Sequence, residues 1–118
     1  MKILYSGVRF DHYNPDRGTS FEHNTFYEGL RSLPGAEVIY HPFDRIKEVG
    51  KAGFNRELLD AVRREKPDLF FAFMLSDEFE PAVLKEIKKL TTSAAWFADD
   101  HWRFWNYSRR WANLFTWV

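Results

Sequence analysis

The chemically richest stretch of the chain is WFADDHWRFW, residues 96 to 105. It places Asp99 and Asp100 next to His101 and Arg103, among large aromatic rings. Two carboxylates and an imidazole at a strand end can bind a divalent metal, a sugar hydroxyl or a reacting proton. Adjacent carboxylates point in different directions. We therefore expect Asp99 to face a cleft as the one candidate catalytic residue, Asp100 to cap the following helix, and Arg103 to pair with either.

Several familiar kinds of site are disfavoured by the spacing. No third metal ligand accompanies the two aspartates, so we expect no bound metal. GxSxG is absent, which leaves a hydrolase triad unsupported. Neither GxGxxG nor GxxxxGK[ST] is present, so a phosphate cradle of either kind is disfavoured. Phosphorelay receivers also carry paired acids, but at their first strand, which here ends in YSG.

A second polar group lies in the long loop from Gly7 to Gly18. Long loops at this kind of position often contact ligands, and the helix start at Thr19 and Ser20 would favour an anion. The alternative is a plain surface loop. The candidate substrate-binding residues of the loop are Gly7, Arg9, Asp11, His12 and Arg17.

A third group, Ser76, Asp77 and Glu78, follows an apolar run. We favour a role in helix entry and capping, and keep Asp77 as a substrate-binding candidate. His23 and His41 are expected to be structural.

The elements that must position these groups can be recognised from hydrophobic periodicity and breakers. Thr19 and Glu22 form a capping-box pattern, and Asn55 is placed to cap a helix. Residues 42–54 are predicted to form a linking loop, with room for one irregular turn. Strands are expected at 2–7, 36–41, 68–75, 91–98 and 114–118, and helices at 19–33, 56–66, 81–90 and 99–113.

This alternation predicts an α/β fold, a Rossmann-like or flavodoxin-like three-layer domain with a parallel sheet of about five strands. The continuous apolar run at 68–75 is typical of a central parallel strand. A strand order of 2-1-3-4-5 is the simplest, with 3-2-1-4-5 as the rival. In such sheets ligands bind at the carboxyl ends of the strands, here 7–18, 41–45, 76–80 and 99–103.

Aromatic residues are abundant, at 19% of the chain. Tryptophans at helical spacing can stack on sugars but pack more often in a core or a domain interface. We expect packing for Trp96, Trp102, Trp105 and Trp111, with room for one exposed exception. Phe104 and Tyr107 should pack inward together with Trp111.

Composition narrows the class of protein further. The net charge is zero, which argues against a nucleic-acid-binding face. No run of about 20 apolar residues could span a bilayer, and MKILYSG is not a signal peptide. Cysteine is absent, which suits a reducing compartment, so a cytoplasmic location is expected. The chain stops in the apolar run LFTWV, which suggests a fragment of a longer protein.

Three segments together resemble the N-terminal domain of CgeB-like, spore-maturation-type glycosyltransferases. They are residues 1–7 with 18–44, residues 55–81 and residues 84–118. The most specific is WFADDHWRFWNYSRRWA, followed by KPDLFFAFMLSDE, and the similarity runs nearly end to end. The resemblance implies a GT-B enzyme, in which two Rossmann-like domains enclose the active site. Residues 1–118 would be the acceptor-side domain, inactive by itself. The partners would be a sugar acceptor, a nucleotide-sugar donor and the protein's own C-terminal domain, with no tightly bound cofactor or metal.

Other functions stay open at this level. The aromatic surplus also fits a non-catalytic flavodoxin-like binding or interaction module, and an exposed aromatic C-terminus would favour a homodimer. A nucleotide- or flavin-binding enzyme is a further alternative on this fold, although no motif supports it.

Overall fold

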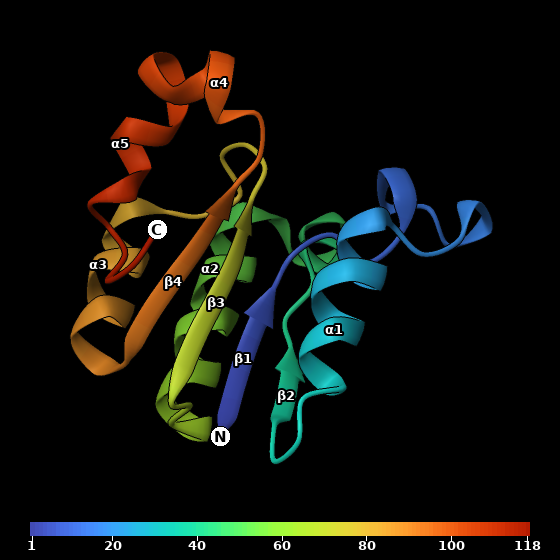
Figure 1. Ribbon diagram of the computed structural model, residues 1–118, viewed down its shortest axis with the longest axis horizontal. Helices are drawn as coiled ribbons and strands as arrows, with labels where there is room; N and C mark the ends of the chain where they lie inside the picture. Colours follow the sequence, from blue (N-terminus) through green and yellow to red (C-terminus); the bar gives the residue numbers. More distant parts are fainter.

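The computed structural model describes residues 1–118 and shows a mixed α/β fold with a four-stranded, all-parallel sheet (Figure 1). The strand order is β2-β1-β3-β4, which agrees with the simpler of the two predicted orders and excludes its rival. The arrangement is compatible with a Rossmann-like fold. The strands are β1 (Lys2–Ser6), β2 (Glu37–Tyr40), β3 (Leu69–Met74) and β4 (Thr92–Phe97).

Helices cover the two faces of the sheet unequally (Figure 1). One face carries α1 (Glu28–Arg31), which continues the π-helical turn His23–Tyr27. The other carries α2 (Ile46–Glu65) and α3 (Pro81–Leu90). After β4 the chain forms one helical run made of α4 (Asp100–Arg103), a π-helical turn (Phe104–Ser108) and α5 (Arg109–Ala112). None of these helices is long and apolar enough to cross a membrane.

The predicted fifth strand is not formed. Residues 114–118 meet the sheet through an isolated bridge from Trp117 to Ala94 and through hydrogen bonds between Thr116 and Ser93. Leu114 and Phe115, which are neighbours in the chain, are both buried in the core. Successive side chains of a strand point to opposite faces, whereas Leu114 and Phe115 both join the same core cluster, so the segment does not continue as a regular strand.

The predicted loop at 42–54 is also wrong, because α2 begins at Ile46. Gly50 interrupts it with a φ of 74°, a left-handed conformation that glycine adopts without strain. Ile46 and Val49 pack against the core before this break, which gives the early turn a reason to form. Asn55 is therefore inside a helix and does not cap one.

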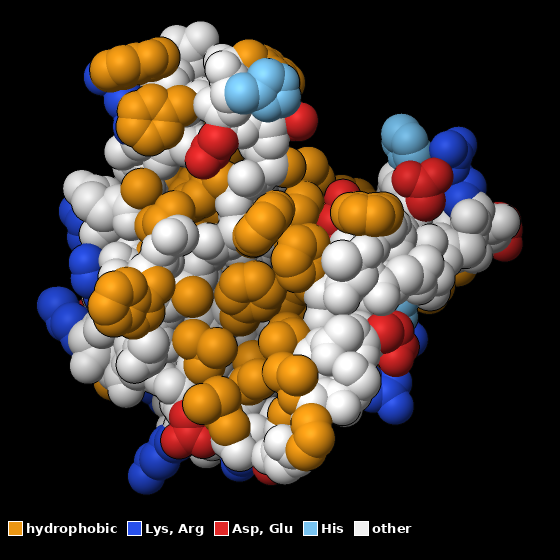
Figure 2. Space-filling view, in the orientation of Figure 1, with side chains coloured by type: hydrophobic (Ala, Val, Ile, Leu, Met, Phe, Trp, Pro, Cys, Tyr) orange, Lys and Arg blue, Asp and Glu red, His pale blue; other side chains and the backbone are white.

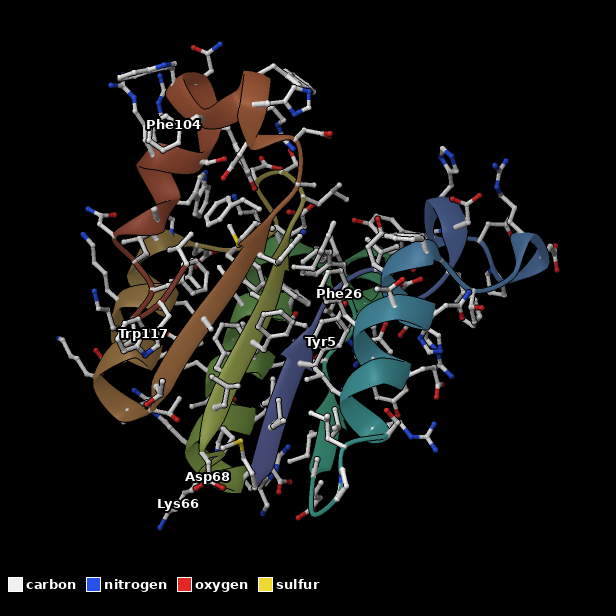
Figure 3. The ribbon with its side chains drawn as sticks, in the orientation of Figure 1. Tyr5, Phe26, Lys66, Asp68, Phe104 and Trp117 are labelled. Carbon is white, nitrogen blue, oxygen red and sulfur yellow. The ribbon has the colours of Figure 1, made fainter.

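The face that α1 covers is left partly open over β3 and β4. Phe26 reaches across from the α1 side to Phe71, Phe73 and Trp96, with its ring centroid 5.7 Å from that of Trp96. Trp96 nevertheless keeps 54% of its surface exposed, contrary to the expected packing. Apolar side chains form a broad area on this face (Figure 2), and Tyr5 and Phe26 mark its border with α1 (Figure 3).

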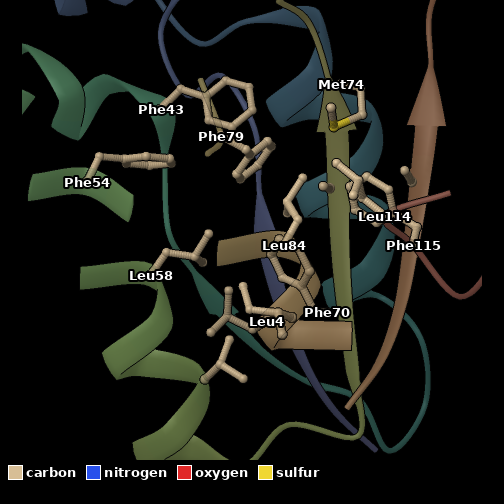
Figure 4. Close-up of a cluster of buried hydrophobic side chains, with 14 of the residues drawn as sticks. Leu4, Phe43, Phe54, Leu58, Phe70, Met74, Phe79, Leu84, Leu114 and Phe115 are labelled. Atoms are coloured by element: carbon tan, nitrogen blue, oxygen red, sulfur yellow. The ribbon is translucent and has the colours of Figure 1, made fainter. Parts of the chain in front are cut away.

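The main core lies on the opposite face, between the sheet and the pair α2 and α3 (Figure 4). Alternate strand residues such as Leu4, Phe70 and Met74 point into it, and Phe54 and Leu84 meet them from the helices. Each of these side chains is almost completely buried, which contributes about 1.5–3 kcal/mol apiece. This core fixes the strand ends from which the polar loops leave.

Candidate functional site

The topology defines a crevice between the carboxyl ends of β1 and β3. The connection after β1 passes through α1 on one face, whereas the connection after β3 passes through α3 on the other. The two loops therefore diverge, and such switch points are where open parallel sheets bind ligands. A pocket of about 420 Å³ lies there, lined by Val8, Asp11, His12, Tyr13, Ser20, Glu22 and Leu75.

The loop after β1 folds back on itself. Phe10 and Thr19 form an antiparallel bridge, and the Asp11 amide donates to the Gly18 carbonyl at 3.0 Å. The Ser20 hydroxyl donates to the Val8 carbonyl at 2.6 Å and accepts from the His23 amide at 3.0 Å. Ser20, and not Thr19, therefore caps the following helix, and it also closes the base of the loop.

Asp44 anchors the same loop from the segment after β2. Its two carboxylate oxygens accept hydrogen bonds from the amides of Arg9, at 2.7 Å, and Phe10, at 3.0 Å. The Lys47 ammonium also donates to the Tyr13 carbonyl at 3.3 Å. Charge-assisted bonds to backbone groups hold a loop more firmly than neutral ones.

Two consecutive pocket residues adopt left-handed backbone conformations. His12 has a φ of 52° and Tyr13 a φ of 58°. Non-glycine residues pay roughly 1–2 kcal/mol for this conformation, and such strain tends to cluster at functional sites. The surrounding bonds from Asp44, Lys47 and Ser20 hold the strained turn in place.

The loop after β3 is held by a buried amide. Asn55 is completely buried in α2 and donates through Nδ2 to the carbonyls of Lys51, at 2.9 Å, and Glu78, at 2.8 Å. Its Oδ1 accepts from the Glu80 amide at 2.8 Å. These bonds fix residues 78–80, at the end of the loop whose first residue, Leu75, lines the pocket.

Acidic groups from two strand ends act on Tyr13. Burial, followed by the negative charges of Glu78, Asp44 and Asp77, raises the pKa of the Tyr13 hydroxyl to about 12. Burial also raises the pKa of Glu78, although the Ser76 amide donates to its carboxylate at 2.9 Å. The Tyr13 hydroxyl is therefore protonated at neutral pH and acts as a hydrogen-bond donor or acceptor, not as a base.

The predicted residues of the first loop separate into two groups. Asp11 and His12 line the pocket, whereas Gly7 is buried beneath it against Tyr5. The Arg17 guanidinium forms an ion pair with Asp11 at 2.9 Å. Other candidates point elsewhere: Arg9 lies over the Phe10 ring, and Asp77 is exposed, 3.9 Å from Lys51.

The residues after β4 do not line this pocket. Asp99 is exposed with a φ of 60°, a left-handed conformation that aspartate tolerates, and it does not line the pocket. Asp100 is the first residue of α4 and accepts a hydrogen bond from Ser108, so it is not the predicted cap. His101 is exposed.

Arg103 links this segment to the pocket wall. Its Nη2 donates to the Leu75 carbonyl at 2.8 Å, and its guanidinium carbon lies 4.0 Å from the centre of the Tyr107 ring. The Tyr107 hydroxyl donates to the Ser76 carbonyl. The segment after β4 therefore supports the loop after β3 from behind, instead of presenting its own acids to the pocket.

Several residues that line or support the pocket were not chosen as site residues from the sequence. Glu22 appeared only as a capping residue and Glu78 only as part of a helix entry, while Tyr13 and Asp44 were not chosen. Of these residues, Asp44 had the clearest signal in the sequence, because it lies in the segment 41–45 that was predicted to follow a strand end.

The pocket presents two carboxylates, an imidazole and the Tyr13 hydroxyl over a partly apolar wall. These groups accept and donate hydrogen bonds to a hydroxyl-rich small molecule, and the volume is within the usual range for such ligands. No group of three or more His, Asp or Glu side chains is arranged to hold a metal ion.

Fold and pocket together define an α/β protein, compatible with a Rossmann-like fold, with a polar crevice at the switch point of its sheet. Comparison with known proteins adds no closer identification: no protein-family model, curated protein or solved structure matches the chain.

Proposed function

We propose that this chain is the acceptor-side, Rossmann-like three-layer domain of a two-domain GT-B glycosyltransferase of the CgeB-like kind. The complete enzyme would be cytoplasmic and would transfer a sugar from a nucleotide sugar, and the chain alone would be inactive. The resemblance of WFADDHWRFWNYSRRWA and KPDLFFAFMLSDE to that family supports the assignment. The nucleotide-sugar contacts would come largely from a C-terminal domain.

The observation that carries this proposal is the switch-point pocket. Asp11 and Glu22 offer carboxylate oxygens to acceptor hydroxyls, and His12 and Tyr13 add groups that both donate and accept. An acceptor bound there would lie at the carboxyl edge of the sheet, where a second domain can approach. Asp99 lies on the same edge outside the pocket and is proposed to face the donor side.

Binding to the isolated chain tests the acceptor role. Titration with mono- and oligosaccharides, followed by amide chemical shifts, should perturb residues 11–13 and 20–22. Asp11→Asn and Glu22→Gln should weaken binding, whereas Asp77→Asn should not, because Asp77 is 83% exposed and does not line the pocket. Shifts that spread evenly over the surface, or none with any sugar, would count against the role.

Turnover tests the enzyme class. A protein in which this chain is followed by its C-terminal domain should hydrolyse or transfer from a nucleotide sugar, and Asp99→Ala should reduce that rate. Unchanged turnover in a folded Asp99→Ala enzyme would reject Asp99 as a contributor. Absence of turnover with every nucleotide sugar tried would reject the class.

A non-catalytic binding or interaction module is the second candidate. The observation that favours it is the exposure of Trp96, Trp102, Trp105 and Trp117, each more than half accessible. Monomers rarely expose so much aromatic surface without a use for it.

A further inference from the structure

The helical run after β4 projects beyond the carboxyl edge of the sheet (Figure 1) and carries exposed aromatic rings, of which Phe104 is labelled in Figure 3. Trp102, Phe104 and Trp105, which we call the aromatic tip, are 63%, 44% and 68% exposed. The opposite side of the same run packs inward through Tyr107 and Trp111. The predicted packing is therefore wrong for all three tip residues, and the tip contributes little to the core.

Two arginines without an ion-pair partner follow the tip. The Arg109 guanidinium carbon lies 5.2 Å from the centre of the Trp105 ring. Arg109 and its neighbour Arg110 form no ion pair. Residues 99–118 contain three arginines and two aspartates, Asp99 and Asp100, of which Asp100 accepts a hydrogen bond from Ser108. A pocket of about 380 Å³ beside this run is lined by Arg110 and Lys85 and has no carboxylate. The surplus is local, because the whole chain has a net charge of zero.

We propose that the aromatic tip binds peripherally to the surface of an anionic lipid bilayer. Trp and Phe rings settle at the level of the headgroups, and arginines beside them pair with lipid phosphates. The tip combines both features on one projecting helical run. This inference does not depend on the glycosyltransferase proposal.

Single-stranded nucleic acid is the other polyanion that aromatic and arginine side chains can bind. It requires rings onto which successive bases stack. Phe104 and Trp105 instead meet at an interplanar angle of 81°, which gives no common stacking plane. The charge complements a bilayer equally well, and a bilayer does not require parallel rings.

Vesicle co-sedimentation of the 118-residue chain tests the proposal. The chain should bind vesicles of phosphatidylcholine with phosphatidylglycerol, with a blue shift of tryptophan emission, and should bind pure phosphatidylcholine much more weakly. Arg109→Ala with Arg110→Ala should lower the affinity about 30-fold, since each arginine contributes about 1 kcal/mol near an anionic surface. Trp102→Ala with Trp105→Ala should lower it more than about tenfold through lost apolar contact.

Trp117→Ala is the matched control. Trp117 is as exposed as Trp105, at 68%, but lies beside β4, well away from the tip (Figure 3). Its variant should bind vesicles like the parent, and circular dichroism should show all variants folded, because the altered side chains are exposed. The proposal is overturned by no binding to anionic vesicles, by equal loss in Trp117→Ala, or by tip-dependent dimerisation or oligonucleotide binding in its place.

Discussion

Replacing Asn55 by alanine should loosen the pocket from a position that does not touch it. Asn55 is completely buried and makes three hydrogen bonds, two donated and one accepted. Each such bond is worth about 1 kcal/mol net, and the carbonyl of Glu78 and the amide of Glu80 would lose a partner in a part-buried setting. We therefore expect Asn55→Ala to lower the free energy of unfolding by about 3 kcal/mol.

Urea denaturation measures this loss directly, and Asn106→Ala is the matched control. Asn106 is also helical but is exposed, so the same substitution there changes helix propensity without removing buried bonds. The effect should also be local: hydrogen exchange at the Glu80 amide should become much faster in Asn55→Ala, while the amides of β3 keep their protection apart from the global change.

Two outcomes would refute this reasoning. A stability loss no larger than that of Asn106→Ala would mean that the three bonds do not hold the loop. A full loss with uniform acceleration of exchange along the chain would mean that Asn55 stabilises the core as a whole and not the loop after β3.

Three further predictions use the same stability assay. Gly7→Ala should be strongly destabilising, because the added methyl would overlap the Tyr5 hydroxyl and lie 2.7 Å from Cζ of the same ring. Tyr5→Phe should be neutral or stabilising, since the Tyr5 hydroxyl is buried without a partner. Tyr5→Phe should also partly rescue the stability of Gly7→Ala. Asp44→Ala should cost about 2 kcal/mol and increase exchange at the Arg9 amide, because two charge-assisted bonds are lost; unchanged exchange would exclude the anchor. Burial raises the pKa of Glu78 above its usual value, so the folded state holds the carboxyl proton to higher pH than the unfolded state. The contribution of Glu78 to stability therefore falls as the pH rises through this range. Glu78→Gln should remove that decline and stabilise the protein at pH 7, and an unaltered pH profile of stability would contradict this prediction.

The elements that periodicity and breakers define locally were predicted correctly. The helix expected at 81–90 coincides with α3, because Pro81 starts it and Leu84 and Ile87 bury one face. The apolar run at 68–75 contains β3, which lies inside the sheet, where both of its faces require apolar residues.

The errors arise where tertiary contacts decide the local structure. Asparagine is a common helix-capping residue, so the sequence predicts a cap at Asn55. Only the fold brings the carbonyl of Glu78 and the amide of Glu80 within hydrogen-bonding distance of its side chain. The run at 114–118 has the apolar composition of a strand. Leu114 and Phe115 are buried in the core instead, and only Thr116 and Trp117 form hydrogen bonds with β4.

The candidate site was predictable as a place more than as a set of residues. The position of the switch point follows from the strand order, and the structure places Asp11 and His12 in the lining of a pocket there. Glu22 and Glu78 have the sequence context of helix starts, so their positions at the pocket and beside Tyr13 depend on loop geometry that no short pattern encodes. The left-handed conformation of Asp99 is equally invisible in the sequence, and the most conspicuous acids do not line the pocket.

The segments after all four strands line the pocket or hold its walls in place. Asp44, after β2, fixes the loop after β1, and Arg103, after β4, fixes the carbonyl of Leu75, after β3. A ligand that enters between Tyr13 and Leu75 therefore meets walls whose positions are set by side chains outside the pocket. This explains why the stretch at 96–105 can matter for function without contacting the ligand: its arginine holds the wall, and its exposed rings stay free for another surface.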